Sequence, residues 1–351
     1  MKKALIIIGS LLLLIAGGIA GAFFLLRNSG EKHLKESMQG PPPELAAAGE
    51  LPVEEVTEKE QAVWQEGWIK HNGRIYAYNE DILTFLIMGI DRKGEVKEVK
   101  EGTNGGQADA LFLLVFDPHK RATTVIGINR NLMTDIEIYD GNGKYVETRT
   151  AQIAVQHGFG NGVEKSCEYQ VEAVKRVLYD LPIGRYAAIN MSAVSVINDL
   201  AGGVDVTVNE DLTKADKALK KGETVHLTGK QAFRYVQWRD REEFGSADLR
   251  LERQKQYLKA LIGKLRKAVK EDPSIIAKLY QTIRNEMTTD LTMDELMYLT
   301  PEVADYSFGS ESFRMIPGKT VMGEKYEEFY PDKMALFELI LDVFYEEVET
   351  D

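Results

Sequence analysis

The N-terminus of this chain contains an apolar stretch that leaves little choice of structure. After Met1-Lys2-Lys3, the positions from Ala4 to Leu26 form a run of 23 residues without a charged side chain. A helix of this length can cross the hydrocarbon core of a bilayer. We therefore predict that residues 1–27 comprise a short cytoplasmic stub and one transmembrane helix, which serves as a signal anchor.

The charges beside this stretch predict its orientation. Lys2 and Lys3 precede it and only Arg27 follows directly, so the positive-inside rule places the N-terminus in the cytoplasm and the rest outside. A cleaved signal peptide is the alternative, but the apolar region exceeds the usual ~7–15 residues and no convincing Ala-x-Ala site follows it. The expected location is the cell membrane, with a single pass and an extracellular folded part.

The residues after the apolar stretch divide into a linker and a folded part. Residues 28–62 contain Gly40-Pro-Pro-Pro43 and runs rich in Glu, which predict a flexible tether. The remaining residues, roughly 290, suit one large domain or one domain with appendages. We predict a catalytic domain over 63–272, and helices and a strand over 273–351 that complete it or are appended to it.

Apolar periodicity predicts an α/β fold for the folded part. Trp68 to Tyr78 is expected to form a hairpin around Asn72-Gly73, because this pair readily adopts the positive φ angles of a tight turn. Strands are expected at 82–90, 111–116, 123–128, 204–208 and 312–316, and helices at about 163–179, 192–200, 229–236, 248–270, 275–284, 293–304 and 331–347. Helices interleaved with strands predict a sheet flanked by helices.

Charged residues lie at the ends of the first three apolar runs. Asp91 follows the first run, Asp109 precedes the second, and Arg130 follows the third. Mg²⁺ prefers a few carboxylates and is often completed by substrate phosphates, so the two aspartates are candidate metal ligands. The alternatives are that each aspartate only ends a strand and that Arg130 only pairs with a nearby carboxylate.

A cluster of arginines reverses the local charge of an acidic chain. The net charge is −12, yet five arginines lie within a short segment: Arg234, Arg239, Arg241, Arg250 and Arg253. In a helix that begins near Asp248, Arg250 and Gln254 fall on the apolar stripe and point inward. Burying an arginine without an anionic partner is costly, so the cluster predicts an anion-binding site.

Several other functions are disfavoured by the sequence. Cys167 is the only cysteine, which excludes an intrachain disulfide and a thiolate metal site, and we expect it to pack within a helix. The five histidines lack metal-ligand spacing, and His157 is expected in a surface loop rather than at a site. Nucleic acid is an unexpected partner for an acidic, extracellular chain.

Six motifs in order resemble those of the LytR-CpsA-Psr family of bacterial envelope proteins. They are Gly89-Ile-Asp91-Arg92, Gln107-Ala-Asp109-Ala110, Asn129-Arg130-Asn131, Gly202-Gly-Val-Asp-Val206, Tyr235-Val-Gln237-Trp-Arg239 and Arg250-Leu-Glu-Arg253-Gln254. The resemblance covers about residues 82–265. It implies a central mixed sheet flanked by helices and a Gram-positive bacterial source.

The resemblance also implies an activity and its residues. Members of the family are phosphotransferases that move a glycopolymer from a polyprenyl pyrophosphate carrier to peptidoglycan or another envelope acceptor. By analogy, Asp91 and Asp109 would hold Mg²⁺, and Arg130 and Arg239 would be catalytic. The residues expected to bind the substrate pyrophosphate are Arg130, Arg239, Arg241, Arg250, Arg253 and Gln254. An apolar cavity under the sheet would hold the lipid tail.

Four departures from the family pattern leave alternatives open. Gln107, Asn131 and Gln237 replace an arginine, an aspartate and an arginine, and the spacing from Asp248 to Arg250 is one residue short. An amide at 131 cannot serve as a base, a role that Asp240 or Asp135 could assume. The chain could therefore be a weakened member that binds lipid pyrophosphate or a partner as a scaffold or regulator. It could also be a hydrolase that uses water as the acceptor.

Overall fold

The structure is a computed structural model that describes residues 25–38, 42–43, 45, 51–57, 64–100, 102, 104–240 and 243–348. The predicted transmembrane stretch lies outside these residues except for its last two positions. Among the residues described, no helix combines the length and the apolar composition that crossing a membrane requires.

A six-stranded mixed sheet forms the centre of the molecule. Its strands, in spatial order, are β11 (Met287–Thr289), β8 (Arg185–Asn190), β3 (Leu83–Ile90), β4 (Ala108–Asp117), β5 (Ala122–Ile128) and β12 (Phe313–Met315). β3 runs antiparallel to β4 and parallel to β8, and β12 runs parallel to β5. The α/β class and the central mixed sheet are therefore confirmed.

The antiparallel order of β3, β4 and β5 brings three strand ends together. Both pairs are antiparallel, so the end of β3, the start of β4 and the end of β5 share one edge of the sheet. Here this edge means the side at which strand ends lie, not an outermost strand. This edge carries Asp91, Asp109 and Arg130. Apolar side chains on both faces of these strands are buried, which explains why the runs show little polar alternation.

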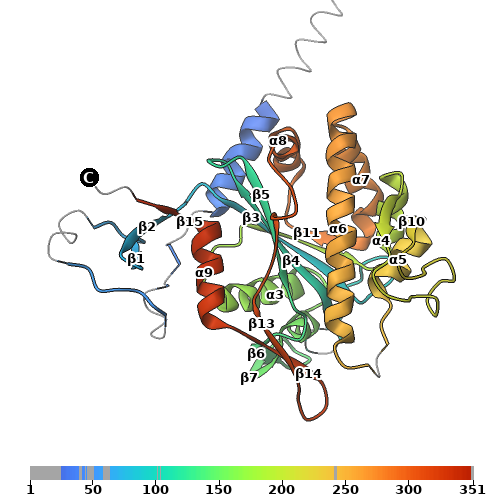
Figure 1. Cartoon of the computed structure of the whole chain (residues 1–351), viewed down its shortest axis with the longest axis horizontal. Coiled ribbons are helices and arrows are strands. Elements are labelled where there is room, and N and C mark those ends of the chain that lie inside the picture. Colours follow the sequence, from blue (N-terminus) through green and yellow to red (C-terminus); the bar gives the residue numbers. More distant parts are fainter. Residues whose placement is uncertain are drawn as a thin grey trace, which may run out of the picture.

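Helices cover both faces of the sheet. On one face, α3 (Glu164–Val177) and α9 (Lys333–Phe344) pack against the main core, where Cys167 is fully buried as expected. On the other face lie α4 (Ala193–Leu200), α5 (Gly229–Gln237) and the long α6 (Ser246–Glu271). Figure 1 shows α9 and α6 on opposite sides of β3, β4 and β5.

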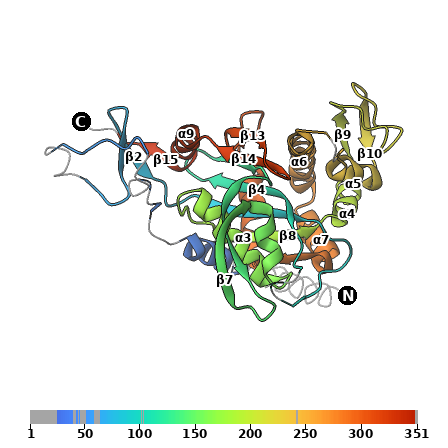
Figure 2. The same cartoon turned by 90° about the horizontal axis from the view of Figure 1, so that it is seen from below.

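The predicted N-terminal hairpin is present and gains a third strand. β1 (Ile69–His71) and β2 (Arg74–Tyr78) join through Asn72 and Gly73, whose φ angles are 52° and 72°. β15 (Tyr345–Glu347) pairs with β2 from the other end of the chain. Figure 2 shows β2 and β15 at one end of the molecule, and β9 (Val204–Thr207) and β10 (Thr224–Leu227) at the other.

Two further hairpins have no counterpart in the predicted elements. One consists of β6 (Met133–Tyr139) and β7 (Tyr145–Gln152), and a short 3₁₀ helix η2 (Ile153–Phe159) follows it. The other consists of β13 (Gly318–Met322) and β14 (Glu327–Pro331). Residues after 273 also supply α7 (Ile275–Ile283), η3 (Arg284–Glu286), α8 (Met293–Ala304) and both edge strands of the central sheet.

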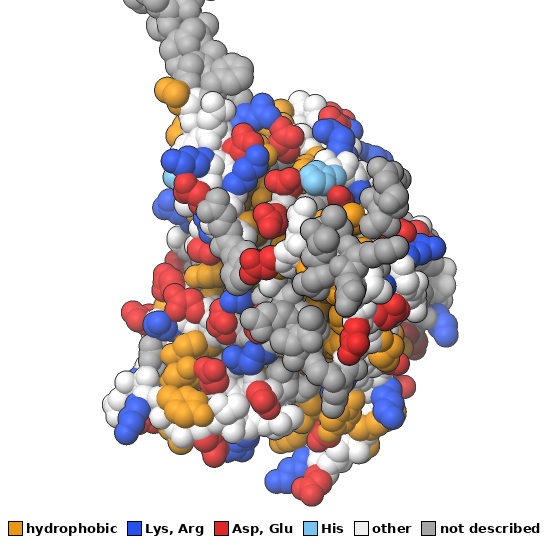
Figure 3. All heavy atoms as spheres, turned by 90° about the vertical axis from the view of Figure 1, so that its left-hand side faces the viewer, with side chains coloured by type: hydrophobic (Ala, Val, Ile, Leu, Met, Phe, Trp, Pro, Cys, Tyr) orange, Lys and Arg blue, Asp and Glu red, His pale blue; other side chains and the backbone are white. Residues whose placement is uncertain are grey.

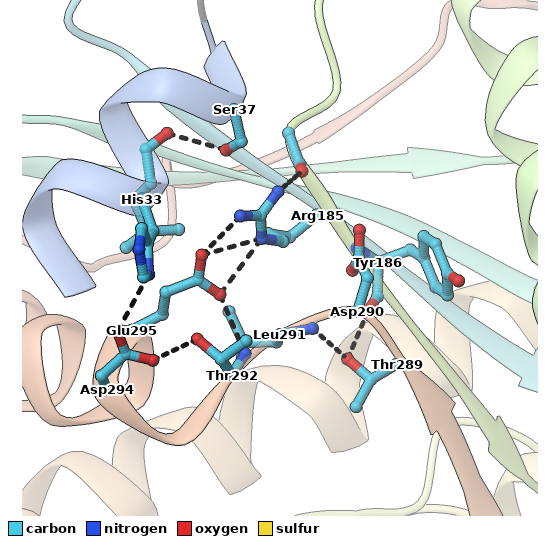
Figure 4. Close-up of polar contacts among 12 residues, drawn as sticks. His33, Ser37, Arg185, Tyr186, Thr289, Asp290, Leu291, Thr292, Asp294 and Glu295 are labelled. Atoms are coloured by element: carbon cyan, nitrogen blue, oxygen red, sulfur yellow. Dashed lines mark hydrogen bonds and ion pairs between the residues drawn. The ribbon is translucent and has the colours of Figure 1, made fainter. Parts of the chain in front are cut away.

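The predicted tether contains a helix that packs against the domain. Residues 25–38 are helical, and Leu34 is fully buried in a cluster with Phe85 and Leu299. His33 points toward Asp294 at the start of α8, with 3.0 Å between Nδ1 and Oδ2, as Figure 4 shows. Beside this contact Arg185 of β8 pairs with the fully buried Glu295. The first part of residues 28–62 is therefore held by apolar and ionic contacts.

The molecular surface mixes both signs of charge. On the face that Figure 3 presents, basic and acidic side chains are interspersed with apolar ones. Ion pairs such as Arg74–Glu347 and Arg314–Asp342 are solvent-exposed and contribute little to stability. At the sheet edge that carries Asp109 and Arg130, by contrast, the charged side chains are largely buried.

Candidate functional site

A cavity of about 470 Å³ opens at the sheet edge where β3, β4 and β5 meet α6. Five of the predicted site residues line it: Asp91, Asp109, Arg130, Arg239 and Arg250. Gln107 and Asn131, two of the positions that depart from the family pattern, line it as well. Residues that are far apart in sequence thus converge because antiparallel pairing and α6 bring their elements to one edge.

Asp109 lies between two arginines of the cavity. Its Oδ1 is 3.2 Å from Nε of Arg130, and its Oδ2 is 3.0 Å from Nη1 of Arg250. Arg130 also donates from Nη2 to Oε1 of Gln107 at 2.6 Å. Arg130 thus pairs with a nearby carboxylate, as the alternative interpretation held. The pair is part of the cavity, however, so pairing does not exclude a role in the site.

Electrostatic repulsion acts among three arginines of the cavity. Burial lowers the pKa of Arg250 to about 10, Asp109 opposes this shift, and the positive charges of Arg130 and Arg239 add to it. Arg250 is only 4% exposed, yet it remains protonated at neutral pH. Since one carboxylate lies between two of the three guanidinium groups, a bound polyanion would relieve their mutual repulsion.

Asp91 offers a second carboxylate at the same edge. Its Oδ1 accepts a hydrogen bond from the backbone N–H of Gln107 at 2.7 Å, and its side chain is exposed to the cavity. Among the described residues, no group of three or more metal-binding side chains occurs. Two carboxylates alone fit a hard cation that keeps waters and takes its other ligands from phosphate oxygens, as Mg²⁺ does.

The structure places two predicted ligands outside this cavity. Arg253 is fully buried, pairs with Oε1 of Glu210 at 2.9 Å and donates to the carbonyl oxygen of Trp238. Gln254 donates to the carbonyl oxygen of Val236 at 3.1 Å. Both side chains instead fix the segment that carries Arg239. Arg241, a further predicted ligand, lies outside the described residues.

An apolar pocket of about 130 Å³ lies on the face of the sheet that α6 covers. Its lining includes Met88, Phe112, Met191, Tyr257 and Leu261. Gln254 is the one strongly polar side chain among the lining residues that the structure describes. Asp109 in β4 and Arg250 in α6 line the charged cavity, whereas Ala110 and Gln254, in the same two elements, line this pocket. A charged cavity and an apolar pocket thus adjoin along α6.

The β13–β14 hairpin forms a wall of the charged cavity that was not predicted. Met322, Lys325, Tyr326 and Glu327 line the cavity, and Tyr326 is 70% exposed. No chemistry was predicted for the residues after 273. Gly323, between two segments of strand length, could have indicated a turn but not its position beside Arg130.

His157 is buried rather than in a surface loop, so that prediction was wrong. It is 1% exposed, and its Nδ1 lies 3.0 Å from the carbonyl oxygen of Gly106, next to Gln107. Burial lowers the pKa of His157 to about 4, so the imidazole is neutral at physiological pH. This side chain supports the loop that carries Gln107 and does not line the cavity.

Comparisons with known proteins converge on one family. The family model described as LytR_cpsA_psr family matches residues 52–339. The polyisoprenyl-teichoic acid–peptidoglycan teichoic acid transferase TagU of Bacillus cereus (strain AH820) is 28% identical over 236 residues, which cover 67% of this chain and 69% of that protein.

Solved structures share the fold. B. subtilis TagV superposes with a TM-score of 0.56 at 24% identity, covering 75% of this chain and 95% of that one. TagT bound to LI-WTA superposes with a TM-score of 0.55 at 21% identity, covering 75% and 89%. At these identities the likeness concerns the fold alone.

Proposed function

This chain belongs to the LytR-CpsA-Psr family, and we propose that it transfers a glycopolymer from a polyprenyl-pyrophosphate carrier to an acceptor in the cell envelope. One observation carries the proposal: three arginines converge on a cavity that adjoins an apolar pocket. A pyrophosphate lipid has this combination of a polyanionic head and an apolar tail. The names of the TagU relatives agree with such a substrate.

The arginines would bind and activate the pyrophosphate. Arg130, Arg239 and Arg250 present guanidinium groups to one cavity, and planar forks of donors suit phosphate oxygens. Negative charge builds on the bridging oxygen as the phosphoric anhydride breaks, so positive groups fixed in place lower the barrier. We assign catalysis to Arg130 and Arg239, and binding also to Arg250.

Asp91 and Asp109 are the residues that would hold Mg²⁺. When bound, Mg²⁺ would supply charge neutralisation at the phosphate oxygens. We assign Asp109 a second role, which its ion pairs support: it would orient Arg130 and Arg250 toward the same cavity. Replacing either aspartate should therefore affect turnover, although for different reasons.

The apolar pocket would take the part of the lipid nearest the pyrophosphate. Its lining is almost entirely apolar, and burying each methylene contributes about 0.8 kcal/mol. The N-terminal apolar stretch, proposed as a single transmembrane helix, would keep the enzyme in the membrane that supplies this lipid. The folded part, from 63 to 272 with the C-terminal elements, would face the envelope and its peptidoglycan acceptor.

A reconstitution assay tests the proposal. The full-length chain, in detergent, is given a farnesyl-pyrophosphate-linked disaccharide, Mg²⁺ and peptidoglycan oligomers, and released lipid phosphate and modified acceptor are both followed. We expect both products from the wild type and neither from Arg130→Ala.

The two alternatives give different results in the same assay. Tight lipid binding without turnover would favour the scaffold or regulator suggested by Gln107 and Asn131. Release of lipid phosphate without acceptor modification would favour a hydrolase. If Arg130→Ala reacts like the wild type, the site is elsewhere.

A further inference from the structure

The carboxylate expected after Arg130 is absent from this sequence, but a carboxylate is present at that place in the structure. Asn131 stands where the family pattern has aspartate, and the side chain of Glu327 lies against it. We infer that Glu327 is the general base that accepts the proton of the acceptor hydroxyl. This inference rests on the proposed transferase function.

Two donors hold the carboxylate of Glu327 at the cavity wall. Its Oε1 accepts from the backbone N–H of Gly245 at 2.6 Å, and its Oε2 accepts from Nδ2 of Asn131 at 3.2 Å. A carboxylate offers about four lone-pair positions, so each oxygen keeps capacity for a further hydrogen bond. The side chain is half-buried and lines the cavity, so an acceptor hydroxyl can reach it.

Backbone contacts fix β14 in the position that places Glu327 there. Gln152 donates from Nε2 to the carbonyl oxygen of Glu327 at 2.7 Å, and the N–H of Phe329 donates to the carbonyl oxygen of Asn131 at 2.9 Å. Leu132 and Phe329 form a parallel bridge next to this bond. The residue after Arg130 is therefore attached to β14 through both its main chain and its side chain.

A second set of hydrogen bonds ties the other strand of the hairpin to α6. Thr320 of β13 donates to Oδ2 of Asp248 at 2.7 Å, and Asn129 donates from Nδ2 to Oδ1 of the same carboxylate at 2.6 Å. The side chain of Asn129 in turn accepts from the N–H of Asn131 at 2.9 Å. The hairpin, α6 and the segment around Arg130 thus form one connected framework.

The other carboxylates are less suited to this role. Asp91 and Asp109 are the proposed metal ligands, and both oxygens of Asp109 also form ion pairs with arginines. Asp240 pairs with Lys214 and Asp135 accepts from Thr150, and neither lines the cavity. Glu243 lines it, but its side chain is exposed. Glu327 is the half-buried carboxylate that two donors orient.

Asn131 and Glu327 are chemically matched to each other. An amide can donate to a carboxylate, whereas an aspartate at 131 would place two carboxylates at hydrogen-bonding distance and force one to bind a proton. The amide at 131 therefore suits a site whose base comes from β14. The departure from the family pattern relocates the carboxylate instead of removing it.

The step proposed for Glu327 is a displacement at phosphorus. The acceptor hydroxyl oxygen forms a bond to the phosphorus that carries the glycan, and the bond from this phosphorus to the bridging oxygen breaks. The bridging oxygen leaves with polyprenyl monophosphate, and the hydroxyl proton passes to Glu327. Glu327 later returns the proton to solvent or to the released phosphate.

A swap of the two functional groups tests the inference in the full-length chain. With the farnesyl-pyrophosphate-linked disaccharide, Mg²⁺ and peptidoglycan oligomers, we expect Glu327→Gln to slow transfer by about 10²–10⁴-fold. Its affinity for the lipid should be unchanged or higher, because a negative charge leaves an anion site. In the double variant N131D/E327Q the carboxylate moves to position 131, and transfer should recover at least tenfold relative to E327Q.

The outcomes separate this inference from the proposed function. Absence of transfer by the wild type would contradict the proposed function itself. If the wild type is active, E327Q with a rate within about threefold of it would overturn the role of Glu327. A folded double variant as slow as E327Q would overturn it also, and thermal melting of each variant confirms that it is folded.

Discussion

Gln107 accepts a hydrogen bond from Arg130, with 2.6 Å between Oε1 and Nη2, at a position where the family pattern has an arginine. The backbone N–H of Gln107 also donates to Asp91. Gln107 therefore connects the proposed catalytic arginine with the proposed metal ligand. A neutral amide performs this connection without adding a further positive charge to the cavity.

Introducing the family residue at 107 should strengthen anion binding at the expense of stability. In Gln107→Arg, a further guanidinium beside Arg130 raises the affinity for the lipid pyrophosphate by about tenfold, or roughly 1.4 kcal/mol. Repulsion between the two groups lowers the melting temperature of the unliganded protein. Gln107→Glu is the control, since its charge would pair with Arg130 and weaken binding. Calorimetric titration and thermal melting measure both effects, and equal affinities for all three proteins would contradict the assignment.

Arg250 and Arg253 lie three positions apart on α6, and the structure predicts different roles for them. Arg250→Lys loses the planar fork in the cavity, so affinity for the lipid should fall about 10- to 100-fold with a small change in stability. Arg253→Met breaks a buried pair with Glu210 and should destabilise the protein by about 3 kcal/mol. Its affinity for the lipid should stay near that of the wild type. A result in which Arg253→Met folds normally but fails to bind would place Arg253 at the substrate.

Loss of one proposed metal ligand should appear as a change in metal requirement. In Asp91→Asn the concentration of Mg²⁺ that gives half-maximal transfer should rise at least tenfold, because a neutral amide is a poor ligand for a hard cation. Glu243→Gln, a change of the same kind elsewhere in the cavity, is the matched control and should leave this concentration unchanged. Chelation of the metal should stop glycopolymer transfer by the wild type. Identical Mg²⁺ curves for the two variants would remove Asp91 from the metal site.

The buried His157 should make stability depend on pH in a defined window. Its pKa is about 4 in the folded state and about 6.5 when unfolded, so the unfolded state binds the extra proton between these values. Stability from this residue is complete above pH 6.5 and falls by about 3 kcal/mol as the pH drops to 4. Comparing denaturation of the wild type and His157→Gln from pH 7.5 to 4 isolates this loss.

His119 provides a control of opposite sign. Hydrogen bonds that His119 donates to Asp81 and Glu346 raise the pKa of His119, so its contribution is complete below pH 6.5 and is lost as the pH rises. His119→Gln should therefore remove a small stabilisation at low pH. If His157→Gln and the wild type lose stability in parallel below pH 6.5, the imidazole is not buried in its neutral form.

The helix formed by residues 25–38 should contribute to the stability of the domain. Leu34→Ala removes a fully buried side chain between Phe85 and Leu299 and should cost about 2–4 kcal/mol. Lys35→Ala, at an exposed position of the same helix, should change stability by less than about 0.5 kcal/mol. Chemical denaturation of the full-length chain compares the two. Equal stabilities would mean that this helix does not pack on the domain in solution.

Local patterns in the sequence were sufficient for much of the central architecture. The apolar runs that became β3, β4 and β5 and the inward direction of Arg250 follow from side-chain periodicity. The Asn72-Gly73 hairpin follows from turn chemistry. Local residue preferences determine these features, so one sequence is enough to predict them.

The features that were not predicted depend on contacts between distant segments. β14 carries Glu327 to Asn131, 196 positions away in the chain, and no local pattern encodes that pairing. Arg253 looks like a phosphate ligand from its motif, but Glu210 and Trp238 meet it inside the fold. His157 follows a similar rule, because its burial results from the Gly105-Gly106 loop that closes over it.

The contact between the N-terminal helix and α8 would set a working distance. Arg27 pairs with Glu302 near the end of α8, and Arg266 and Lys270 of α6 contact the same end through Ala304 and Asp305. Arg250 lies 20 residues before Lys270 in α6, so at a rise of 1.5 Å per residue the two positions are about 30 Å apart along the helix. If residues 4–26 span the bilayer, no flexible segment separates the membrane from the domain. The cavity would then lie at a fixed height above the membrane, and the domain would act only on envelope strands that pass within a narrow range of that height.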